Sequence, residues 1–100
     1  MGHLILDRLT SLPPNTKFPE TIKGVLYLDN LTSIPPNTKF PETIGYLNLN
    51  SLTSLPPNTK FPKTIKGDLY LDSLTSLPIE VWNSMSDQVK SIIPERLIPT

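Results

Sequence analysis

The sequence predicts a small solenoid of stacked turns, each made of one short β-strand and an extended return segment. Three observations predict this fold. A phrase recurs every 21 or 22 residues, a Leu-x-Leu motif lies at the same place in each copy, and Pro-Pro pairs recur with the same period. The prolines matter because proline fixes φ and offers no N–H, so it interrupts strands and helices at regular places.

The repeated phrase has three complete copies and a fourth that stops at Pro78. The copies start at Leu4, Leu26, Leu47 and Leu69. A period of roughly 20 to 29 residues built on Leu-x-Leu and a following leucine is the signature of the leucine-rich repeat. We therefore expect two parts: leucine-rich repeats in residues 1–77, and a C-terminal helical cap with its tail in residues 78–100.

The leucines predict the core. Side chains alternate along a strand, so both leucines of each Leu-x-Leu motif point inward, and successive strands pair in parallel about 4.8 Å apart as a four-strand ladder. Two further inward columns are expected after the strands, at Leu9, Leu31, Leu52 and Leu74, and at Leu12, Ile34, Leu55 and Leu77. Stacking then buries apolar surface that a single turn could not bury alone.

The return segments follow the Pro-Pro pairs, so we expect them to be extended, polyproline-like or 3₁₀ rather than α-helical. Three phenylalanines are expected to anchor them to the core, with three isoleucines behind: Phe18, Phe40, Phe61, Ile22, Ile44 and Ile65. A glycine closes each return segment, at Gly24, Gly45 and Gly67. We expect these glycines to adopt positive φ in a tight turn into the next strand.

The two ends of the array differ. Residues 79–93 predict short helices that cover the last turn, with Pro78 as a first helical position, Ser84 or Ser86 as a cap, and Trp82 as the main plug. Trp82 as a binding hot spot is the alternative. No comparable cap precedes the first strand, so residues 4–7 offer an open edge, and we expect a homodimer through this edge strand.

The phrases Leu-Thr-Ser-Leu-Pro-Pro at 9–14 and 52–57, and Leu-Thr-Ser-Ile-Pro-Pro at 31–36, resemble the bacterial type of leucine-rich repeat. This type occurs in secreted effectors of pathogenic bacteria and in bacterial and phage proteins. The resemblance covers residues 4–78 and implies protein recognition through a concave, strand-lined face. The chain departs from the family in its shortened strand motif, where the usual ladder-forming asparagine is missing or displaced.

Outward strand positions vary between the copies while the leucine, proline, phenylalanine and glycine columns scarcely change. Tyrosines beside acids and amides on a rigid sheet are typical of recognition surfaces, because tyrosine offers a large area at low entropic cost. The predicted protein-binding residues are Ile5, Asp7, Val25, Tyr27, Asp29, Tyr46, Asn48, Asn50, Asp68, Tyr70 and Asp72. The alternative is drift at positions that no core constrains.

Charge is sorted between the strands and the return segments. Four acids lie on the predicted strand face, which carries no lysine, while the lysines fall on the return segments. An acidic face predicts a partner protein with a basic surface, such as the nucleic-acid site of another protein, which this chain would then inhibit. The alternative is charge that serves solubility alone.

Composition argues against other classes of function. The net charge is zero, so direct nucleic-acid binding is not expected, and no apolar run approaches the roughly 20 residues of a membrane helix. Cysteine is absent, and the only histidine, His3, is expected in a flexible terminus, so we expect no enzyme, cofactor or metal site. No secretory signal is visible, and we expect the cytoplasm, that of the host if a phage encodes the chain. A self-assembling structural element and a fragment of a longer array remain the alternatives.

Overall fold

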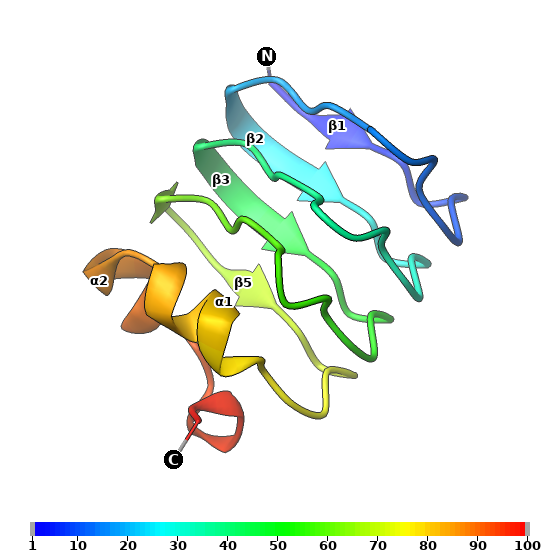
Figure 1. Ribbon diagram of the computed structural model, residues 1–100. Coiled ribbons are helices and arrows are strands. Elements are labelled where there is room, and N and C mark those ends of the chain that lie inside the picture. The colour runs from blue at the N-terminus through cyan, green and yellow to red at the C-terminus, as the bar shows by residue number, and fades with distance from the viewer. Residues whose placement is uncertain (1, 100) are drawn as a thin grey trace.

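The computed structural model describes residues 2–99 as a small parallel sheet followed by short helices (Figure 1). The outermost residues of the two predicted parts, Met1 and Thr100, lie outside the described range. The strands are β1 (Leu4–Ile5), β2 (Thr21–Tyr27), β3 (Thr43–Asn48), β4 (Thr64–Ile65) and β5 (Leu69–Tyr70). The helices are α1 (Ile79–Ser84), α2 (Asp87–Lys90) and the 3₁₀ helix η1 (Glu95–Leu97). Within residues 2–99, no helix is long and apolar enough to cross a membrane.

The strands pair in the register of the repeat. Leu4 pairs with Leu26, Leu26 with Leu47, and Leu47 with Leu69, always in parallel. The strand order is β1-β2-β3-β4, and β5 also pairs with β3, because two short strands, β4 at the end of the third copy and β5 at the start of the fourth, pair with the two ends of β3. The predicted parallel ladder is therefore confirmed. Its strands β2 and β3 begin earlier than expected, three residues before the glycine of β2 and two before that of β3.

The core lies between the sheet and the return segments. The Leu-x-Leu side chains of the two middle copies are fully buried, at Leu26, Leu28, Leu47 and Leu49. Burying such a side chain contributes about 1.5 to 3 kcal/mol. In the first copy Leu4, Leu6 and Leu9 are only half-buried, because no described strand covers the outer edge of β1. The rings of Phe18 and Phe40 stack, with centroids 5.8 Å apart.

The glycines have a different role from the one predicted. Gly24 and Gly45 lie inside β2 and β3, and none of the described glycines has positive φ. They are required by close approach instead, because a Cβ on Gly45 would lie 2.5 Å from the carbonyl oxygen of Gly24. Positive φ occurs at Asn15 (65°) and Asn37 (66°), one residue after the Pro-Pro pairs, since asparagine tolerates the left-handed region.

The C-terminal helices close the last turn with small and medium side chains. Val81, Met85 and Val89 are buried, whereas Trp82 is half-buried with the Lys90 ammonium 5.3 Å from its ring centroid. Trp82 is therefore not the main plug, because its ring lies at the margin of the contact. Pro78 also precedes α1 and is not its first residue, while the Ser86 hydroxyl caps α2 by accepting the Val89 N–H at 3.3 Å.

Side chains of the cap bind backbone groups of the last turn of the repeat. The Gln88 amide accepts from the Ile65 N–H and donates to the Ile65 carbonyl oxygen, both at 2.8 Å. The Arg96 guanidinium donates to the carbonyl oxygens of Leu71 and Leu74. The Gln88 contacts satisfy backbone groups of β4 that a next strand would otherwise pair, so β4 is closed to edge pairing, while Arg96 holds carbonyl oxygens of the turn that follows β5.

Gly45→Val should be far more damaging than Lys23→Val. A side chain at Gly45 would collide with the backbone of β2, whereas the Lys23 side chain is exposed. We expect Gly45→Val to lower the free energy of unfolding by about 3 kcal/mol and Lys23→Val by no more than about 0.5 kcal/mol. Thermal denaturation of both variants measures this, and equal melting temperatures would contradict the close approach of β2 and β3.

Candidate functional site

The sheet brings the predicted binding residues together on its outward side, which we call the strand face. The parallel register places Ile5, Tyr27, Asn48 and Tyr70 in one row across the sheet. Val25 and Tyr46 are paired in the neighbouring row. Residues that lie more than 60 positions apart in the sequence therefore form one surface. These residues are brought together only by the parallel register of the repeats.

Exposure differs among the tyrosines of the strand face. Tyr46 is 43% and Tyr70 39% exposed, while Tyr27 is half-buried. The Tyr46 ring lies over Gly67, where a Cβ would collide with it. Glycine at the end of the third copy thus leaves room for an aromatic ring from the end of the second. The aromatic area offered to a partner comes mainly from Tyr46 and Tyr70.

The C-terminal end of the strand face combines aromatic and acidic groups. The Tyr70 hydroxyl donates to Asp68 Oδ2 at 3.2 Å. This hydrogen bond and the Asp68 charge raise the pKa of Tyr70 above its ordinary value of 10.0, with smaller contributions from desolvation, Tyr46 and Asp72. The contact therefore orients the phenol and favours its protonated form. Asp7, Asp68 and Asp72 are exposed, and Asp29 is half-buried.

The amide side chains of the strand face bind the backbone of neighbouring turns. Asn50 Oδ1 accepts the Asp72 N–H at 3.2 Å, and Asn48 Oδ1 accepts the Asn50 N–H at 3.1 Å. One copy earlier, Asn30 Nδ2 donates to the Asp7 carbonyl oxygen. The asparagine ladder is thus displaced rather than missing. Asn50 holds neighbouring turns together and Asn48 orders its own turn, structural roles that the outward variation between copies did not reveal.

His3 is held in place, contrary to the expectation of a flexible terminus. Its Nδ1 accepts the Val25 N–H at 3.0 Å, and its ring covers Gly24 as Tyr46 covers Gly67. The backbone before His3 is also held, because the Gly2 carbonyl oxygen accepts the Gly24 N–H at 2.6 Å and extends the pairing with β2. Across residues 2–99, no group of three or more histidine or acidic side chains is arranged to hold a metal ion.

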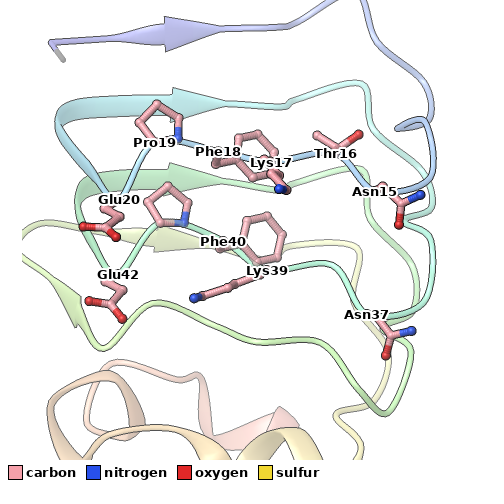
Figure 2. Close-up of a pocket in the computed structure, with 11 residues that line it drawn as sticks. Asn15, Thr16, Lys17, Phe18, Pro19, Glu20, Asn37, Lys39, Phe40 and Glu42 are labelled. Carbon is pink, nitrogen blue, oxygen red and sulfur yellow. The ribbon is translucent and has the colours of Figure 1, made fainter.

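A second surface lies on the return segments, where sequence reasoning placed no site. A groove of about 400 Å³, which we call the return groove, is lined by residues 15–20 and by five residues of the segment 37–42 (Figure 2). Lys-Phe-Pro-Glu occurs in both segments and is the signal that could have indicated it. The groove itself depends on how the two segments pack, which no single copy of the repeat specifies.

Asp68→Asn should lower the pKa of Tyr70 toward its ordinary value. The substitution removes both the charge and the carboxylate acceptor that favour the protonated phenol. Absorbance of tyrosinate during alkaline titration measures the change, with Tyr70→Phe identifying the signal. Asp7→Asn, on the first copy, is the matched control and should leave this titration unchanged. An unaltered midpoint in Asp68→Asn would contradict the Tyr70–Asp68 contact.

We compared the chain with models of protein families, with characterised proteins and with solved structures. None of these comparisons found a significant match. What the molecule offers to a partner is therefore argued from its own two surfaces, the strand face and the return groove.

Proposed function

We propose that this chain is a leucine-rich-repeat solenoid that binds a partner protein through its strand face, without catalysis. The observation that carries the proposal is the pair of exposed rings, Tyr46 and Tyr70, beside Asp68 and Asp72. Large aromatic side chains commonly dominate the energy of protein interfaces. Here they stand on strands whose backbone is already paired, so binding orders few groups and loses little entropy.

The charge of the strand face indicates the kind of partner. No lysine lies in the paired rows of its tyrosines. Lys23 lies inside β2, contrary to the sequence expectation, but before Gly24, and the other described lysines lie outside the named strands. A basic protein surface is complementary, and such surfaces include nucleic-acid-binding sites. The chain would then act as an inhibitor of bacterial or phage origin in a cytoplasm, with no cofactor, metal, membrane or direct nucleic-acid partner. Charge that serves only solubility, and drift of the outward residues, are the competing explanations.

A structural role is the second candidate, and the open edge of β1 favours it. Leu4 and Leu6 are half-buried and Ile5 is 60% exposed, whereas the opposite end of the sheet is covered by the cap. A self-assembling element would join two copies through this edge. A fragment of a longer array would join the preceding copy of its own repeat there.

Tyr46→Ala and Tyr70→Ala should each weaken partner binding by about tenfold or more, since aromatic anchors commonly lose about 2 kcal/mol on truncation. The partner is captured from the source cell with the immobilised chain, and its affinity for each variant is then measured. Lys60→Ala, on the third return segment, is the control and should retain the affinity. Loss with Lys60→Ala and no loss with the tyrosine variants would place the partner on the return side.

Ile5→Lys tests the structural candidate. If two copies join through β1, the wild-type chain should dimerise with increasing concentration, and a charge at the centre of the edge should prevent it. Ile79→Lys is the matched control, because Ile79 is 51% exposed on the cap, away from β1. Sedimentation measures both. A wild-type chain that stays monomeric up to high micromolar concentration removes the edge dimer.

A further inference from the structure

The walls of the return groove are rigid. Each begins with a Pro-Pro pair followed by an asparagine in the left-handed region, Asn15 or Asn37. The next threonine closes the turn, since the Thr16 hydroxyl donates to the Pro13 carbonyl oxygen at 2.6 Å and that of Thr38 to Pro35 at 2.7 Å. The groove is thus formed before any ligand arrives, which lowers the entropic cost of binding.

The groove has an apolar floor flanked by charged side chains. Phe18 and Pro19 are half-buried at its surface, while Phe40, stacked on Phe18 at 5.8 Å with the planes 12° apart, and Pro41 are buried beneath. The glutamate pair, Glu20 and Glu42, lies together at one end of the groove, whereas the lysine pair, Lys17 and Lys39, branches from the chain just before the rings, with the Lys39 side chain running past Phe40 toward Glu42 (Figure 2). All four charged side chains are exposed.

We propose that the return groove binds an extended, polyproline-like peptide segment of a partner, with an acidic side chain facing the lysine pair and a basic one facing the glutamate pair. Aromatic and proline-lined grooves suit such peptides. A polyproline II helix has three residues per turn and rises about 3.1 Å per residue, so side chains three positions apart share one side, about 9 Å apart. The lysine and glutamate pairs are also three residues apart, on extended chain, which spans about 10 Å.

The third copy marks the limit of the site. It reads Lys60-Phe61-Pro62-Lys63, so a lysine replaces the glutamate, and its residues do not line the groove. Phe61 is also turned by 70° to Phe40, so the stacked rings end at the second copy. The natural presence of Lys63 shows that lysine is compatible with the fold at this position of the repeat. Substituting the glutamate pair by lysine therefore separates binding from folding.

The test uses a labelled peptide with the core Glu-Pro-Pro-Arg and measures its fluorescence anisotropy with the full chain. We expect saturable binding that the double variant Glu20→Lys, Glu42→Lys weakens tenfold or more. The same variant should gain affinity for a Glu-Pro-Pro-Glu peptide. The double variant Glu80→Lys, Glu95→Lys alters the net charge equally on exposed glutamates of the cap, and it should bind like the wild type.

Three results would overturn the proposal. One is absence of binding, and another is equal loss in the cap control, which would reduce the effect to net charge. A third is a dimer of the wild-type chain that the substitutions at the glutamate pair abolish, because a second copy would then occupy the groove. Tyr70→Ala should leave peptide binding unchanged. The proposed peptide site in the return groove and the proposed partner site on the strand face are therefore tested independently.

Discussion

Leucine stacked on leucine is the constraint on which the whole molecule depends. Each turn must return the chain to its starting position after 21 or 22 residues, so that Leu26 meets Leu47 and Leu47 meets Leu69. A slip of one residue would exchange the inward and outward side chains of a strand. The paired backbone at the glycines, the bent Pro-Pro-Asn segments and the asparagine hydrogen bonds all serve to keep this register.

The same constraint separates constant from variable surface. Inward positions admit one kind of side chain because identical copies must pack on both sides of them, whereas outward positions are free to differ. Tyr46, for instance, shares its row with Val25, and the Gly67 beneath its ring makes the exchange possible. The return side is more uniform, yet the exchange of glutamate for Lys63 changes its charge locally. Single substitutions between copies therefore change the chemistry of both surfaces, while the backbone of the repeat stays the same.

Periodicity predicted what depends on periodicity. The leucine columns, the parallel pairing and the extended return segments follow from spacing alone, and each agrees with the structure. Other features depend on neighbours that spacing does not identify. A repeated glycine indicates that no Cβ fits at that position, but not why. At Gly45 the adjacent strand leaves no room for a Cβ, and the φ angle of Gly45 is not positive. Likewise the size of Trp82 does not tell whether it fills the core, which Val81 and Met85 do.

The hydrogen bonds from Gln88 and Arg96 to the last turn have a consequence for assembly. Edge strands that are free at both ends of a sheet allow head-to-tail addition, which continues without limit and produces fibres. Here the Gln88 amide occupies the N–H and carbonyl groups of Ile65, so pairing of a further strand is blocked at β4, whereas the outer edge of β1 is open in the described residues. The two ends of the sheet are therefore unequal, and strand addition meets a polar side chain at one of them. A single glutamine thus opposes unlimited growth of the sheet.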